Sequence, residues 1–141
     1  MRRSLSLTAV LACIALSAGC DNSGGSSTSP TPVPLTTDTF TGTVDPMGSA
    51  FHSFTVVQAG ELDVTLTAAG PPSTIFMGLG IGVLSSDATA CSRDTRFDVA
   101  AQGSTTPQIP VNAGAGKYCV QVFDIGNQTA QVSYTITVAH S

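Results

Sequence analysis

The chain has few charged and few aromatic residues, and these shortages exclude several classes of protein. Charged residues make up 10% of the 141 positions, well below the roughly 25% of an ordinary soluble domain. Five basic residues stand against nine acidic ones, so we expect no binding of nucleic acid. The chain has no tryptophan and only two tyrosines, which leaves few rings on which a sugar could stack.

Glutamate, lysine and arginine are also scarce, whereas threonine, serine, glycine and alanine are abundant. Threonine and valine suit the pleated, half-buried surface of a sheet, while helical proteins carry much more Glu, Lys, Leu and Arg. Hydrophobic residues still make up 42% of the chain, enough for the core of one domain at this length. The composition therefore predicts an all-β exported protein.

The first nineteen residues have the pattern of a secretory signal. Met1–Arg3 is positively charged and Leu5–Leu16 is apolar. This apolar run is too short for a comfortable transmembrane helix, which needs about 20 apolar residues. We therefore expect a signal helix within residues 1–19 that is removed before Cys20.

The residues Leu16-Ser17-Ala18-Gly19-Cys20 resemble the lipobox of bacterial lipoprotein precursors, with Ser17 where that family usually has a branched aliphatic residue. The resemblance implies a covalent lipid on Cys20, such as palmitate within a multiply acylated cysteine, and stable membrane anchoring. It also implies export to the periplasmic face or the cell surface. The alternative is an ordinary secretory signal that contains a cysteine.

Residues 20–36 contain almost nothing that a folded domain could bury. Glycine and serine fill the first half of this segment and proline recurs in the second. Such composition is typical of a flexible tether that becomes more extended toward its end. We expect a disordered linker over 20–36 and a folded domain over 37–141.

From Thr39 onward, apolar and polar residues alternate in short runs that turn residues separate. The clearest run is Glu61–Thr67, where Leu62, Val64 and Leu66 share one face. Short alternating runs predict half-buried strands, and many of them in succession predict a sandwich or a barrel. We expect about seven or eight mainly antiparallel strands.

Several of these runs resemble the bacterial pre-peptidase C-terminal domain, across roughly residues 37 to 140. The matching segments are Phe40–Gly42, His52–Val56, Ala59–Thr67, Gly116–Val122 and Val132–Val138. The resemblance implies a jelly-roll-like β-sandwich, of a kind that accompanies secreted hydrolases as an accessory domain. The sequence contains no peptidase, so a role in peptidase export or processing is not carried over.

Two cysteines remain once Cys13 is assigned to the signal and Cys20 to the lipid. Cys91 and Cys119 form an even pair in an oxidising compartment, so we expect a disulfide. Closing a loop of about 29 residues contributes roughly 3.5 kcal/mol in the chain-entropy model. A metal or redox pair is the alternative, although neither residue has a histidine or another cysteine near it in the sequence.

No catalytic motif is evident, and we do not expect an enzyme. A G-x-S-x-G elbow is missing, His140 is the penultimate residue, and His52 is expected to be a half-exposed strand residue. The run Gly78–Gly82 lacks the following helix and the third glycine offset of a nucleotide loop. Alternating glycines in a strand more often mark a face on which a backbone or a bulky side chain packs closely.

Three aspartates, Asp94, Asp98 and Asp124, are weak candidates for a calcium site. A bridge between the two cysteines brings the segment of the first two toward the third, and carboxylate oxygens suit calcium. Arg93 and Arg96 are interleaved with these acids. We therefore expect a cluster of ion pairs without a metal, and calcium is the alternative.

Taken together, these features predict a noncatalytic binding or interaction domain that a lipid holds at the cell envelope. We expect a protein partner, because the strand faces are rich in threonine and weakly charged and sheet edges accept other chains. A carbohydrate- or cell-wall-binding accessory module, with or without calcium, is the alternative. We expect no cofactor other than the lipid, and no nucleotide.

Overall fold

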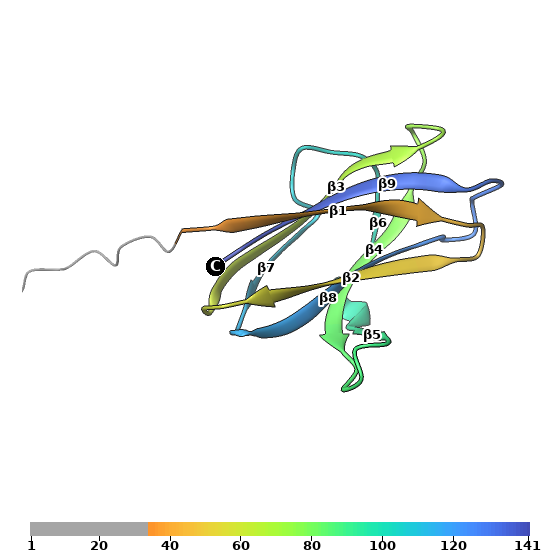
Figure 1. Cartoon of the computed structure of the whole chain (residues 1–141). Helices are drawn as coiled ribbons and strands as arrows, with labels where there is room; N and C mark the ends of the chain where they lie inside the picture. The colour runs from red at the N-terminus through yellow and green to blue at the C-terminus, as the bar shows by residue number, and fades with distance from the viewer. Residues whose placement is uncertain (1–33) are drawn as a thin grey trace, which may run out of the picture. The chain divides into compact units, whose positions relative to one another are not determined.

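The strands of the domain lie in two antiparallel layers, as the computed structural model shows for residues 34–141 (Figure 1). The expected signal helix and most of the expected linker lie outside these residues. The first strand begins at Thr36, one residue before the expected boundary. The elements are β1 (Thr36–Val44), β2 (Ser49–Val56), β3 (Gly60–Gly70), β4 (Met77–Leu84), β5 (Cys91–Arg93), the 3₁₀ turn η1 (Thr95–Phe97), β6 (Val99–Ala101), β7 (Ile109–Ala113), β8 (Gly116–Phe123) and β9 (Val132–His140).

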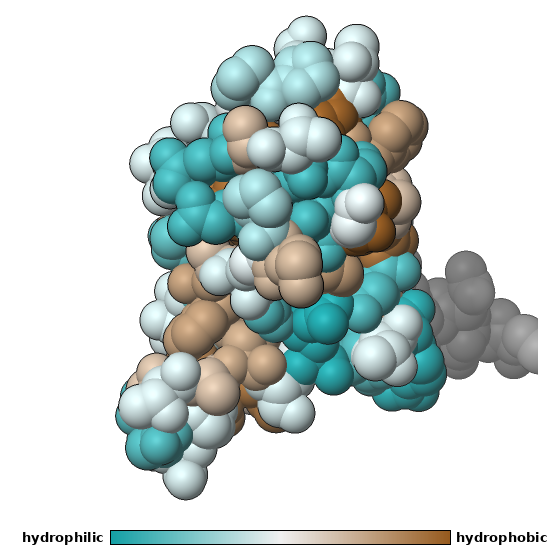
Figure 2. Space-filling model, turned by 90° about the vertical axis from the view of Figure 1, so that its right-hand side faces the viewer, coloured by the Kyte–Doolittle hydropathy of each residue, from teal (hydrophilic) through white to brown (hydrophobic). Residues whose placement is uncertain are grey.

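The four-stranded sheet has the order β1-β9-β3-β7, and the five-stranded sheet has the order β2-β8-β4-β5, with β6 also paired to β4. All of these pairs are antiparallel. The predicted β-sandwich is therefore confirmed. Residues 34–141 contain nine strands, because the chain forms two three-residue strands, β5 and β6, at one edge. The end of the β4–β5 hairpin projects at the bottom of Figure 1 and at the lower left of Figure 2.

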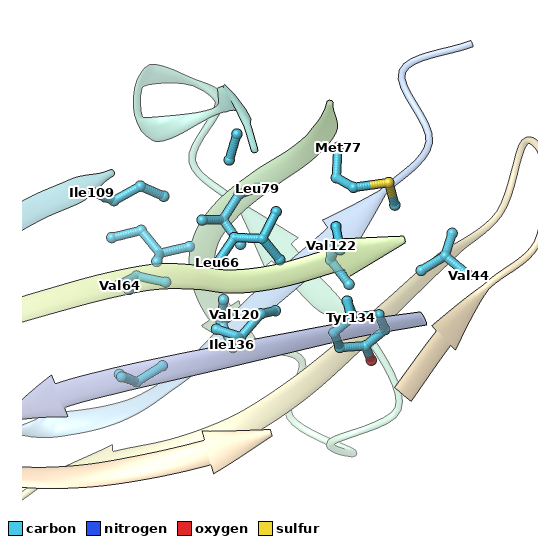
Figure 3. Packing of buried hydrophobic residues seen from close by; sticks show 14 of the residues in the cluster. Val44, Val64, Leu66, Met77, Leu79, Ile109, Val120, Val122, Tyr134 and Ile136 are labelled. Atoms are coloured by element: carbon cyan, nitrogen blue, oxygen red, sulfur yellow. The ribbon is translucent and has the colours of Figure 1, made fainter. Parts of the chain in front are cut away.

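Alternation along each strand explains which side chains form the core. In β9, Val132, Tyr134, Ile136 and Val138 are buried, while the residues between them point to the outer face. Side chains of both sheets fill the space between the layers (Figure 3). The labelled members of this core are Val44, Val64, Leu66, Met77, Leu79, Ile109, Val120, Val122, Tyr134 and Ile136.

Strand β4 departs from this pattern because both of its faces are covered from Met77 to Gly82. Its outer face consists of glycines, and other parts of the chain occupy the places of the missing side chains. The ring of Phe123 lies at Gly78, the carboxylate of Asp98 at Gly80, and the backbone of Ser92 at Gly82. The prediction that these alternating glycines mark close packing is thus confirmed.

The predicted disulfide joins Cys91 in β5 to Cys119 in β8. Both strands pair with β4, and strands that flank a third in a flat sheet lie about 9.5 Å apart. The two Cα atoms are only 5.8 Å apart. Strand β5 therefore curls over the outer face of β4, where Gly82 leaves room for it, and the disulfide holds it there.

Candidate functional site

An apolar hollow of about 450 Å³ lies beside the β4–β5 hairpin. Val83 is 53% exposed, although it lies on the same face of β4 as the buried Leu79 and Ile81. The four-stranded sheet therefore leaves this end of β4 uncovered. Figure 2 shows apolar surface next to the projecting hairpin. The hollow is lined by Ile81, Gly82, Val83, Ser92, Arg93, Asp94, Thr95, Phe97 and Tyr118.

The turn of the β4–β5 hairpin is held by its own side chains. The Ser85 hydroxyl accepts hydrogen bonds from the backbone N–H groups of Thr89 and Ala90 and donates one to Asp87. The hydrogen bond from Ser85, followed by those from Thr89, lowers the pKa of Asp87 to about 2. The hairpin is therefore a locally ordered projection.

The segment after β5 forms the wall of the hollow. The N–H of Asp94 donates to the carbonyl of Ile81 at 2.9 Å, which ties this segment to β4. The Asp94 carboxylate caps η1 by accepting from the N–H of Arg96, and it forms an ion pair with the Arg96 guanidinium at 2.5 Å. The side-chain hydrogen bond from Arg96 lowers the pKa of Asp94. Phe97, the last residue of η1, packs against the core.

Arg93 and Asp98 close the other side of this segment, over the glycine face of β4. Their side chains form an ion pair at 2.6 Å, and the Arg93 guanidinium lies 3.9 Å from the centroid of the Phe123 ring. The expected cluster of ion pairs is therefore present, with Asp94 and Asp98 each matched to one arginine.

Asp124, the third calcium candidate, has backbone partners. Its two oxygens accept from the N–H groups of Met47, Gly126, Asn127 and Gln128 at 2.8 to 3.2 Å. The hydrogen bond from Met47 is the largest of the causes that lower the pKa of Asp124. Within the part of the chain that the structure describes, no three His, Cys, Asp or Glu side chains gather where they could hold a metal ion.

The two histidines lie between the layers of the sandwich. His52 of β2 stacks on Phe40, with ring centroids 4.7 Å apart, and its Nε2 lies 2.7 Å from the hydroxyl of Tyr134. Burial lowers the pKa of His52. His140 is 3% exposed, and its Nε2 lies 3.1 Å from an oxygen of Asp38. The position of His140 next to the end of the sequence gave no indication that this side chain is buried.

Sequence reasoning also missed the apolar lining of the hollow. Val83 has the same alternation as its buried neighbours, and Phe97 lies inside a polar run. Tyr118 lies in the run Gly116–Val122, and its ring stacks on that of Phe54 with the ring centroids 6.0 Å apart. Its hydroxyl donates to the carbonyl of Gly114, and the residue also lines the hollow.

No protein-family model matches the chain, and no curated protein matches its sequence. Among residues 34–141, no helix has the length and hydropathy needed to cross a membrane. The molecule is therefore classified here by its fold and by the geometry of its site. It contains a disulfide-bridged β-sandwich with an apolar hollow beside a projecting hairpin.

Proposed function

We propose that the chain is an exported bacterial lipoprotein, anchored by a lipid on Cys20, whose β-sandwich binds a protein partner without catalysing a reaction. The hollow beside the β4–β5 hairpin is the observation that carries this proposal. It combines an apolar lining with a polar border, an arrangement typical of protein-binding surfaces. The likeness of the N-terminal residues to a lipobox supports the anchor, and the likeness to the pre-peptidase C-terminal domain supports an accessory role.

The lining of the hollow indicates what the partner inserts. Ile81, Val83, Phe97 and Tyr118 provide aliphatic and aromatic surface, and Thr95 is among the polar residues at its border. A large apolar side chain fits this surface, because burying such a side chain contributes about 1.5–3 kcal/mol. The polar border then offers hydrogen bonds to the neighbouring backbone of the partner.

Charge restricts the partner further. Residues 34–141 contain eight acidic and three basic residues, a net charge of −5 with neutral histidines. Two of the three basic residues, Arg93 and Arg96, are already in ion pairs. A neutral or basic partner is therefore favoured over an acidic one. The hydroxyl of Tyr118 is engaged within the domain, which makes a sugar platform at this site the weaker alternative.

The experiment that tests this proposal compares retention of the full chain on native envelope protein and on insoluble cell-wall polysaccharide. Val83→Asp places a charge in the hollow, and Val57→Asp is the matched control because Val57 is also exposed and lies outside the hollow. We expect Val83→Asp to weaken retention on protein about tenfold, which corresponds to a loss of about 1.4 kcal/mol at the interface. The control should bind as the wild type does.

Two results would contradict the proposal. Equal retention of both variants on protein would show that the hollow is not the binding site. Retention on polysaccharide alone would replace the protein partner with a carbohydrate-binding role.

A further inference from the structure

Three loops meet at the end of the sandwich opposite the start of β1, and we call this end the loop pole. They are residues 45–48 between β1 and β2, residues 71–76 between β3 and β4, and residues 124–131 between β8 and β9. Figure 2 faces this end of the domain, where apolar atoms emerge among polar ones. Because β1 begins at Thr36 on the other side, the preceding chain joins the sandwich away from the loop pole.

Hydrogen bonds tie the three loops into one surface. Asp124 accepts from the N–H of Met47 at 2.8 Å and from the N–H of Gly126 at 2.8 Å, which joins the first loop to the third. The side-chain amide of Asn127 donates to the carbonyl of Phe76 at 3.0 Å, which joins the third loop to the second. The loop pole is therefore organised before any partner arrives, and such preorganisation favours binding.

Each loop presents one large apolar side chain. Met47 is 94% exposed, Phe76 is 47% exposed and Ile125 is 46% exposed. An exposed apolar residue by itself needs no explanation. Here three of them stand at one end of the domain on loops that hydrogen bonds tie together, and exposed apolar residues gathered in one region mark interaction sites.

Met47 adds an independent argument, because its backbone conformation is unfavourable and its exposed side chain contributes almost no burial that would offset this. It has a φ of +61° at the third position of the turn Asp45–Gly48, which the N–H of Gly48 closes by donating to the carbonyl of Asp45. This left-handed position favours glycine or asparagine. Backbone strain that the surrounding structure maintains is found preferentially at functional sites.

We propose that the loop pole is a second protein-docking surface, separate from the hollow, with Met47 as its central side chain. Its partner has an apolar pocket bordered by lysine or arginine. The three loops contain Asp45 and Asp124 and no basic residue, so their charge complements such a border. The same charge opposes contact with an anionic membrane, which attracts basic segments.

The experiment uses the full chain in the cells that produce it, with a photo-cross-linking amino acid in place of Ile125. Met47→Gly and Ala88→Gly form a matched pair, since Ala88 also has a positive φ, of 57°, and lies in the β4–β5 turn. Both variants relieve a left-handed backbone, so both should keep or raise the melting temperature. Only Met47→Gly should reduce the cross-linked protein adduct, by about tenfold.

The outcomes separate this proposal from its competitors. The proposal is supported if Met47→Gly loses the adduct while Ala88→Gly and Val83→Asp keep it. The partner peptide in the adduct should then contain basic residues beside apolar ones. The proposal is overturned if no protein adduct forms, if Met47→Gly leaves the adduct unchanged, or if the adduct is a phospholipid. Loss of the adduct in Val83→Asp would also overturn it, because the two surfaces would then serve one partner.

Discussion

Single side chains connect the two layers of the sandwich at the β1–β2 side. His52 of one sheet lies against Phe40 and Tyr134 of the other. Gly42 is essential to this contact, because a Cβ at that position would collide with the hydroxyl of Tyr134. The glycine therefore allows the tyrosine to reach the histidine, and a polar contact is kept between the two layers.

We expect His52 to make the domain less stable as the pH falls from 8 to 5. Burial lowers the pKa of His52, so the unfolded state binds the proton more readily than the folded state. The stabilising contribution is fully present above the unfolded pKa of about 6.5 and is lost as the pH falls through the lowered folded value. One proton accounts for at most about 1.4 kcal/mol per pH unit.

Urea unfolding at pH 8 and at pH 5 measures this effect in the wild type and in His52→Gln. The glutamine does not titrate, and it retains a group that can hydrogen-bond to Tyr134. The wild type should lose more stability than the variant between the two pH values. Equal losses would show that His52 does not contribute to the pH dependence.

At the scale of elements, β4 determines how the hollow is built. Its inner face contributes Ile81 and Val83 to the lining. Its outer face, made of glycines, allows the chain after the hairpin to fold back over the strand. The disulfide then holds β5 against this face. The wall of the hollow therefore depends on the glycines of β4.

A methyl group at Gly82 tests this dependence. Gly82→Ala places a Cβ against the backbone of Ser92, so we expect a loss of about 1–3 kcal/mol from overpacking. Gly114→Ala is the matched control, because the nearest atom to its Cβ is the Tyr118 hydroxyl oxygen at 4.0 Å. The control should change the free energy of unfolding by less than about 0.5 kcal/mol. Equal effects in urea unfolding would mean that β5 can move away from β4 freely.

The alternation of apolar and polar residues predicts most of the inward and outward faces of the longer strands. It does not predict which groups pack on those faces. Alternation in β9 correctly separates the buried residues from the outward ones, whereas in β3 Thr65, which alternates with the apolar residues, is buried as well. The glycines of β4 predicted close packing, yet the groups that fill their face come from β5, β8 and the loop before β6. Those partners depend on the tertiary fold, which a single strand does not encode.

The hollow could not be predicted for the same reason. Val83 and Ile81 have identical positions in the alternation, and only the extent of the opposite sheet makes one exposed and the other buried. Strands β5 and β6 have three residues each, too few for a period to appear. The position of Met47 in a turn was predictable from Asp45-Pro46-Met47-Gly48, whereas its left-handed backbone was not.

At the scale of the whole molecule, the proposed lipid site at Cys20 and the proposed binding domain lie in different parts of the chain. Cys20→Ser should release the protein into the soluble fraction and leave the melting temperature unchanged, because Cys20 precedes the sandwich. Cys13→Ser is the matched control, since it also replaces a cysteine before the sandwich but leaves Cys20 in place. Fractionation after a high-salt wash, together with thermal unfolding, measures both effects. A Cys20→Ser protein that stays with the membrane would contradict the lipid anchor.

The direction of β1 has a mechanical consequence. This strand runs from Thr36, where the preceding chain joins the sandwich, to Val44, beside the loop pole, and it pairs with β9 along its whole length. If the proposed lipid holds the start of β1 and the proposed partner pulls on the β8–β9 loop, tension acts between the start of β1 and the start of β9, which lie at opposite ends of this strand pair. Antiparallel hydrogen bonds lie across the strands, so this tension loads the ladder in shear and its bonds must yield together. In that direction the β1–β9 pairing resists being peeled apart one bond at a time.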